Sequence, residues 1–189
     1  MWLNLFLCLL LAHIVADFVL QNKKTCKEKI EKKWCSRYHY AHALLVFGLS
    51  WLAVWDANFM WCALVIGATH FAIDMWKSYR EENVKWFTVD QALHIAVMVG
   101  MAIWWCSKID WSMALDIPVK YVAMTIATIV CWKPSNIFIK LMLRHYSVNM
   151  PEEQGSGFNA GSLIGNIERW LILAWVHSLV VSTWLTTSA

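Results

Sequence analysis

Three pairs of histidine and aspartate stand four residues apart inside apolar stretches of this sequence. The pairs are His13 with Asp17, His70 with Asp74, and Asp90 with His94. A spacing of four residues places both side chains of a pair on one face of a helix. Imidazole and carboxylate groups bind metal ions and transfer protons, and they are costly within membrane-length apolar helices. Their recurrence in one pattern therefore predicts a functional site.

The segments that must position these pairs are strongly apolar. Hydrophobic residues make up 59% of the 189 residues, tryptophan occurs 14 times, and the mean hydropathy is +0.47. Apolar stretches of about 20 residues, long enough to cross a bilayer, alternate with short charged segments. We expect a single all-α integral membrane domain over residues 1–189, a polytopic helical bundle. The first stretch has no basic leader or cleavage site, so it is expected to be retained.

Apolar length predicts six transmembrane helices. They span residues 2–20, 40–56, 59–76, 88–106, 114–132 and 160–185, and form two similar hairpins, 1–56 and 59–106, and a third, 114–185. Lysine and arginine concentrate in three of the connections, at 22–37, 77–85 and 133–144, and only Lys108 falls in the others. The positive-inside rule places these three connections in the cytoplasm and both termini outside.

On this topology the unusual polar residues converge at one depth, near the cytoplasmic leaflet. Inward-running helices end with His13, Asp17, His70 and Asp74, and outward-running helices begin with His42, Asp90, His94, Glu168 and Arg169. Asp17 and Asp74 lie near helix C-termini, where the helix dipole opposes a negative charge. Each therefore needs a bound cation or a close Lys or Arg partner.

The first two hairpins carry the same order of residues. Each has H-x-x-x-D, then a basic segment, then a further histidine, which is His42 or His94. Facing each other, the hairpins would hold one metal ion, or two ions roughly 3.5 to 4 Å apart. Imidazole donors favour Zn, Mn or Fe over Ca. The predicted metal ligands, or residues that orient them, are His13, Asp17, His42, His70, Asp74, Asp90 and His94.

Local explanations exist for some of these residues taken singly. Residues 88–91 fit a T-x-x-Q capping box, which would explain Asp90 as helix-start chemistry. Asp74 fits a surface ion pair with Lys77, and His39 fits an exposed loop residue. Each explanation covers one position only. Three pairs at one depth favour the shared site.

The basic segment 22–37 suggests the partners of the chain. A lysine-rich segment beside the membrane, with Ile30 and Trp34 interspersed, attracts anionic lipid headgroups. It is short and mixed with Glu28 and Glu31, which disfavours nucleic-acid binding. We expect membrane lipids as partners. The sequence does not decide whether the chain also forms a homo-oligomer.

Four motifs extend over the chain. They are H-x3-D-F-x2-Q at 13–21, H-x3-D-x2-K at 70–77, D-Q-x2-H at 90–94 and G-x3-G-x2-E-R at 161–169. With these motifs nearly the whole chain resembles an uncharacterised family of bacterial and phage integral membrane proteins, known only as a domain of unknown function. Its H-x3-D elements are also distantly similar to those of the YdjM-like membrane-bound metal-dependent hydrolases. The resemblance implies a multi-pass protein of the bacterial inner (cytoplasmic) membrane and metal-dependent hydrolysis.

Metal-assisted hydrolysis of a lipid or lipid-linked substrate at the inner leaflet is the function we expect. Glu168 would activate the hydrolytic water, and Arg169 would hold a phosphate or carboxylate of the substrate. The alternative is that Glu168 and Arg169 form a pair with a purely structural role. A cation or proton transporter or channel is the alternative, although transport sites usually lie at the midplane between inverted repeats. A third class is a non-enzymatic sensor or scaffold that a metal stabilises.

Overall fold

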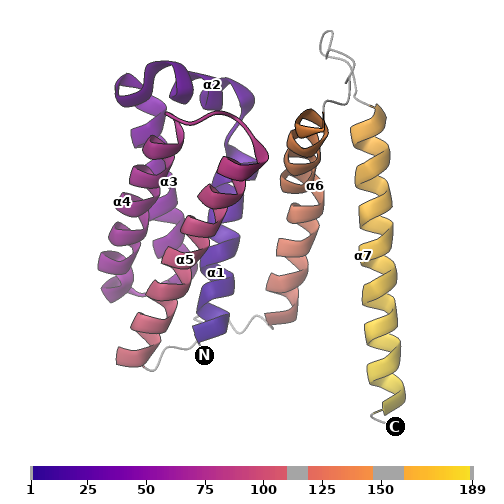
Figure 1. Cartoon of the computed structure of the whole chain (residues 1–189). Helices are drawn as coiled ribbons and strands as arrows, with labels where there is room; N and C mark the ends of the chain where they lie inside the picture. The colour runs from indigo at the N-terminus through magenta and orange to yellow at the C-terminus, as the bar shows by residue number, and fades with distance from the viewer. Residues whose placement is uncertain (1, 110–118, 147–159, 188–189) are drawn as a thin grey trace. The chain divides into compact units, whose positions relative to one another are not determined.

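The computed structural model describes residues 2–109, 119–146 and 160–187, with the side chains of the last helix described from Gly161 to Ser178. All elements of the described residues are helical, which confirms the all-α prediction (Figure 1). They are α1 (Trp2–Ile14), the π-helix η1 (Val15–Leu20), α2 (Lys23–Lys32), the 3-10 turn η2 (Lys33–Cys35), α3 (Arg37–Val54), the 3-10 turn η3 (Ala57–Phe59), α4 (Met60–Lys77), α5 (Val84–Lys108), α6 (Val119–His145) and α7 (Ala160–Thr187). The chain divides into two compact units, Met1–Ile126 and Ala127–Ala189, which are described separately below.

A four-helix bundle made of α1, α3, α4 and α5 is the main part of the first unit, and each of these helices packs against two neighbours (Figure 1). α2 lies across one end of this bundle, where α1 and α4 end and where α3 and α5 begin (Figure 1). Toward the other end the interior is apolar, and its buried residues include Leu5, Leu9, Val46, Val54, Phe59, Cys62, Ala63, Ile66, Met98, Ala102 and Trp105. The buried polar side chains of the bundle therefore gather mainly at the α2 end.

Gly67 brings α3 and α4 close together. A Cβ atom on Gly67 would lie 2.9 Å from the Cβ atom of Phe47 and 3.2 Å from the carbonyl oxygen of Ala43, which is tighter than side chains tolerate. Gly67 lies one turn before His70 on α4, and Ala43 directly follows His42 on α3. The close approach therefore carries two of the predicted ligands toward each other.

The basic segment 22–37 is predicted only as a connection between two spans, and the structure shows that it contains a helix of its own, α2. Asn22 and Thr25 form a capping box at the start of α2, with the Asn22 side chain accepting from the Thr25 amide at 2.9 Å. Pairs of opposite charge at a spacing of four residues, such as Lys32 with Glu28 at 2.9 Å, support the helix further. Lys33 ends it with a positive φ of 48°. Hydrophobicity alone gave no sign of this helix, because its residues are mostly charged.

Four helical segments are long and apolar enough to cross a membrane. They are Trp2–Leu20, Ala57–Lys77, Val84–Lys108 and Val119–His145. The predicted count of six is not confirmed. α3 has only 18 residues and includes Arg37, His39 and His42, which lower its hydropathy. The side chains of α7 are described from Gly161 to Ser178, so the predicted span at 160–185 is covered only in part.

α5 begins earlier than predicted, at Val84 instead of residue 88. Asn83 caps it, with its side chain accepting from the Trp86 amide at 3.0 Å. Thr88, Asp90 and Gln91 therefore lie inside the helix, and the capping-box explanation for Asp90 is wrong.

α6 continues further than predicted. The helix runs to His145 through Pro134, so the whole of the predicted basic connection 133–144 is helical. Proline is tolerated within membrane helices when neighbouring groups satisfy the freed backbone, and here the Ser135 hydroxyl donates to the Val130 carbonyl at 2.7 Å. Residues 114–118 of the predicted span lie outside the described residues.

Candidate metal centre

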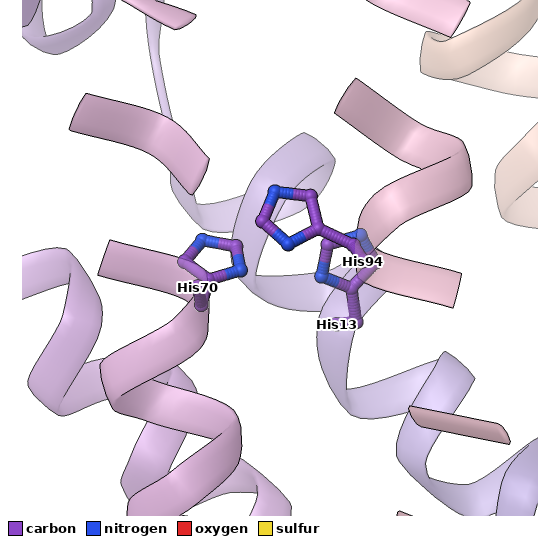
Figure 2. A group of neighbouring side chains, drawn as sticks. All are labelled: His13, His70 and His94. Carbon is purple, nitrogen blue, oxygen red and sulfur yellow. The ribbon is translucent and has the colours of Figure 1, made fainter. Parts of the chain in front are cut away.

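Four buried histidines, one from each helix of the bundle, meet at the α2 end. They are His13 on α1, His42 on α3, His70 on α4 and His94 on α5. The ring centroids of His70 and His94 are 4.2 Å apart, and those of His42 and His70 are 4.9 Å apart. Figure 2 shows the imidazoles of His13, His70 and His94 turned toward one another. The predicted convergence of histidines from distant segments is confirmed.

Asp17 joins His42 and His70 in a compact group of three potential ligand atoms. The Nε2 atoms of His42 and His70 are 3.0 Å apart, and Asp17 Oδ1 lies 3.1 Å from the first and 3.5 Å from the second. Metal bonds of 2.0–2.1 Å place neighbouring ligand atoms roughly 3 to 3.4 Å apart. These three atoms are therefore spaced like one face of a coordination shell. Asp17 lies in the π-helix η1, an irregularity that is frequent at functional sites.

A second group of potential ligand atoms adjoins the first. His94 Nε2 lies 3.4 Å from Asp90 Oδ1 and 3.7 Å from Asp74 Oδ1. The other oxygen of Asp74, Oδ2, lies 3.7 Å from His70 Nε2, so this carboxylate borders both groups. Within each group, potential ligand atoms lie within 4.8 Å of one another, and His13, His70 and His94 form a third such combination. The arrangement can hold one metal ion, or two that share Asp74.

Several polar atoms of the cluster are buried without a hydrogen-bond partner. They are His13 Nε2, His94 Nε2 and Asp90 Oδ1. His13 Nε2 is 3.8 Å from Asp17 Oδ2, beyond hydrogen-bonding distance. An unsatisfied buried polar atom costs about 1 to 3 kcal/mol, so native proteins rarely keep several at one place. Unpartnered imidazole nitrogens beside carboxylates are a donor set that suits a transition metal.

Two lysines neutralise part of the negative charge. Lys29 Nζ donates to Asp74 Oδ2 at 2.5 Å, and Lys77 Nζ donates to Asp90 Oδ2 at 2.5 Å. Gln91 Nε2 also donates to Asp90 Oδ2, at 3.0 Å. The predicted pairing of Asp74 with Lys77 is therefore wrong. Lys77 reaches across to α5, and the partner of Asp74 comes from α2.

Sequence reasoning missed Lys29, which is 6% exposed and is the buried residue of α2. The capping box at Asn22 could have revealed the helix, but no pattern distinguishes Lys29 from the exposed lysines around it. Its inward direction follows from how α2 docks across the bundle. A positively charged side chain from outside the apolar spans thus reaches the candidate metal centre.

His39 is buried, so its prediction as an exposed loop residue is wrong. It lies on the first turn of α3, one turn before His42, with its ring centroid 6.1 Å from that of Phe71 on α4. Neither of its ring nitrogens has a hydrogen-bond partner. His39 takes no part in the three groups of potential metal ligands.

Glu168 and Arg169 belong to the second unit, on α7. Arg169 Nε donates to the Cys131 carbonyl at 2.9 Å, and Arg169 Nη2 donates to Asn136 Oδ1 at 2.6 Å and Asn166 Oδ1 at 2.8 Å. These bonds tie α7 to α6 within that unit. The Glu168 side chain is exposed. The catalytic roles expected of both residues stay predictions.

The fold and the site together define an all-helical protein with membrane-length helices and a buried histidine-aspartate cluster able to hold a metal. Comparison with protein-family models matches residues 5–122, more than half of the chain, to a family described as Protein of unknown function (DUF3307), and the chain belongs to this family. The match includes the seven candidate ligands but not the motif at 161–169, so it is narrower than the predicted resemblance. A search of curated proteins and a search of solved structures each found no match.

Proposed function

We propose that this protein is a membrane-embedded, metal-dependent hydrolase that acts on a lipid or lipid-linked substrate at the cytoplasmic surface of the bacterial inner membrane. One observation carries the proposal. Asp17, His42 and His70 hold their ligand atoms 3.0 to 3.5 Å apart, and a second group adjoins them through Asp74. Structural polar clusters satisfy their buried donors and acceptors, whereas this cluster leaves several open.

Asp17, His42 and His70 would hold one divalent ion, and Asp90 and His94 would hold a second, with Asp74 between them. Zn, Mn or Fe suits this mixture of imidazole and carboxylate. Such an ion supplies Lewis-acid polarisation of the scissile group and a lowered pKa for water. The surrounding bundle supplies the dry, fixed setting, because the apolar core closes the far end. Lys77, whose side chain is 37% exposed, marks the side from which substrate reaches the centre.

We propose α3 as a further span beside the four candidate spans, and keep the predicted span at 160–185 as the sixth. α3 has 18 residues, about 27 Å at roughly 1.5 Å per residue, close to the bilayer core of about 30 Å. Its outward face carries exposed Leu44, Trp51 and Leu52, which suits lipid and not water. The exposed lysines of α2 then lie at the cytoplasmic surface, with the candidate metal centre just beneath and both termini outside.

A cation or proton pathway is the second candidate function. The cluster is a chain of imidazoles and carboxylates, and such chains also relay protons. A transport route needs polar groups through the whole span, but the interior half that lies away from α2 is filled by side chains such as Leu5, Leu9 and Phe59. The one-sided cluster favours chemistry at one membrane surface.

Glu168 and Arg169 are proposed as the water-activating base and the substrate anchor. The exposed carboxylate of Glu168 is free of the bonds that hold Arg169. Arg169 already uses Nε and Nη2 within its own unit, an arrangement that supports the structural alternative for this residue. The proposal of hydrolysis therefore rests mainly on the histidine-aspartate cluster and only secondarily on Glu168 and Arg169.

The metal content of the purified protein tests the proposal. After exchange into fresh detergent, elemental analysis should find one or two equivalents of Zn, Mn or Fe. Asp17→Asn should remove metal from the first group, Asp90→Asn from the second, and Asp74→Asn from both. Asparagine nearly preserves the volume of aspartate, so the loss would report the ligand and not the packing.

His177→Ala is the matched control, because His177 is an exposed histidine of α7. It should leave the metal content unchanged. Protein that contains no metal, and that binds none when Zn or Mn is added, would refute the metal centre. Metal content that stays full in all three asparagine variants would show that the ligands are assigned wrongly.

A further inference from the structure

An apolar groove of about 350 Å³ lies on the face of α4 that points away from the candidate metal centre. It is lined by Trp34, Phe71, Ala72, Met75, Trp76 and Tyr79. Five of these residues follow the helical spacing of one α4 face, or continue it just past the helix end. His70, Asp74 and Lys77 lie on the opposite side of the same helix, at about 100° per residue. The groove is therefore a separate site on the shared helix.

Cationic side chains cover the end of the groove nearest to α2. Lys33 Nζ lies 4.2 Å from the ring centroid of Tyr79. The Arg80 guanidinium lies 5.1 Å from the ring of Trp76 and 4.8 Å from that of Trp86. None of the lining residues themselves, Phe71 and Ala72 included, is charged. The groove thus combines an apolar lining with positive charge at one end, which is called its mouth below.

We propose that this groove binds an acyl chain of an anionic phospholipid, with the lipid phosphate held between Lys33 and Arg80. A soluble anion would interact only with the cationic mouth of the groove. An anionic phospholipid would interact with the mouth through its phosphate and with the apolar aromatic lining through its acyl chain. Tryptophan and tyrosine side chains favour the boundary between headgroups and hydrocarbon, where Trp34 and Tyr79 stand 57% and 53% exposed. Guanidinium and ammonium groups at that depth are complementary to phosphate.

The neighbouring helix α2 supports the same ligand. Its exposed Lys23, Lys24 and Lys27 attract anionic lipid to this surface. The attraction enriches such lipids in general, and the groove then selects one molecule. Because the groove shares α4 with His70 and Asp74, the bound lipid lies one helix away from the candidate metal centre. It is held independently of any metal.

A photoreactive phosphatidylglycerol with its reactive group on an acyl chain tests this site in detergent-purified full-length protein. Illumination should label the α4 peptide that contains Met75 and Trp76. Ala72→Trp fills the groove and should reduce labelling at least tenfold. Leu64→Trp is the matched control, because Leu64 is an exposed residue of α4 outside the groove, and it should label like the wild type.

A second pair of variants tests the mouth. Lys33→Gln with Arg80→Gln should abolish the preference for phosphatidylglycerol over phosphatidylcholine, whereas Lys24→Gln with Lys27→Gln removes equal charge from α2 and should keep it. Excess glycerol phosphate should not compete. Equal labelling of the Ala72→Trp and Leu64→Trp proteins would overturn the proposal, as would a preference that depends on Lys24 and Lys27 instead. Metal content should not change in any of these proteins, so this test fails or succeeds separately from the hydrolase proposal.

Discussion

Replacing Lys29 by methionine should destabilise the metal-free protein far more than a surface change would. Lys29 and Asp74 are 7% and 12% exposed at their side chains, and their charged atoms are 2.5 Å apart. Removing one partner of a buried pair leaves the other charge uncompensated, which costs about 3 to 5 kcal/mol. Methionine keeps most of the side-chain volume, so charge is the main difference.

The same substitution should make the protein more responsive to metal. In the wild type a cation at Asp74 competes with the Lys29 ammonium, and in Lys29→Met it does not. A ligand at 100 times its Kd stabilises the folded state by about 2.7 kcal/mol, so saturating Zn or Mn should recover much of the loss. A given metal concentration should therefore increase the free energy of unfolding by more in Lys29→Met than in the wild type.

Unfolding in detergent micelles, followed by tryptophan fluorescence with chelator or with added Zn, measures both effects. Lys27→Met is the control, because the Lys27 side chain is 77% exposed and pairs with Glu31 at 3.7 Å. Such surface pairs contribute about 0 to 1 kcal/mol. If the Lys29 and Lys27 variants lose equal stability without metal, Lys29 is not part of the charge balance of the cluster. Identical metal responses of variant and wild type would refute the competition.

Three further predictions concern packing, docking and topology. Gly67→Ala should lower the free energy of unfolding by about 1 to 3 kcal/mol, because its Cβ would meet α3 at 2.9 Å, whereas Gly48→Ala has open space and should stabilise by up to about 1 kcal/mol. Burial raises the pKa of the Cys26 thiol, so a smaller fraction of it is thiolate at neutral pH. Maleimide labelling of Cys26 should therefore be slow at neutral pH and become faster as the pH increases. Fast labelling at neutral pH would show that α2 is undocked. Single cysteines at Lys32 and Lys85, in a background without other cysteines, should label from the cytoplasmic side, and labelling from outside would invert the topology.

The meeting of the histidines could be predicted because it depends on few assumptions. Helical spacing sets the face of each residue, and apolar length with the distribution of lysine and arginine sets the direction of each helix. His13 and His70 near helix ends, with His42 and His94 near helix starts, must then lie at similar depth. The exact partners could not be predicted, because a distance of 3.0 Å between two imidazoles depends on helix approach. Gly67 sets that approach, and nothing in the pattern marks it.

Two of the errors concern charged residues whose partners lie on other helices. The sequence of residues 88–91 matches a capping box, but Asn83 caps the helix earlier. Asp90 therefore lies inside the helix, where it pairs with Lys77. The composition of the lysine-rich segment predicts that its side chains are solvated, but Lys29 is buried because α2 packs across the end of the bundle. Asn83 is itself a local capping signal that lies before residues 88–91 in the sequence, whereas Lys29 and Lys77 pair with carboxylates on other helices. Local patterns carry no information about such partners on other helices.

The charge balance of the cluster indicates which part of it would bind metal first. Lys29 pairs with Asp74 and Lys77 pairs with Asp90. Asp17 differs, because among the described residues its ion-pair partners within 4 Å are all histidines. An imidazole is positively charged only when it is protonated, and no lysine in the described part of the chain supplies a permanent positive charge at this carboxylate. The group of Asp17, His42 and His70 has both the closest ligand spacing and, among the described residues, the carboxylate without a lysine partner. A first metal ion would therefore occupy this group, and a second would have to displace a lysine.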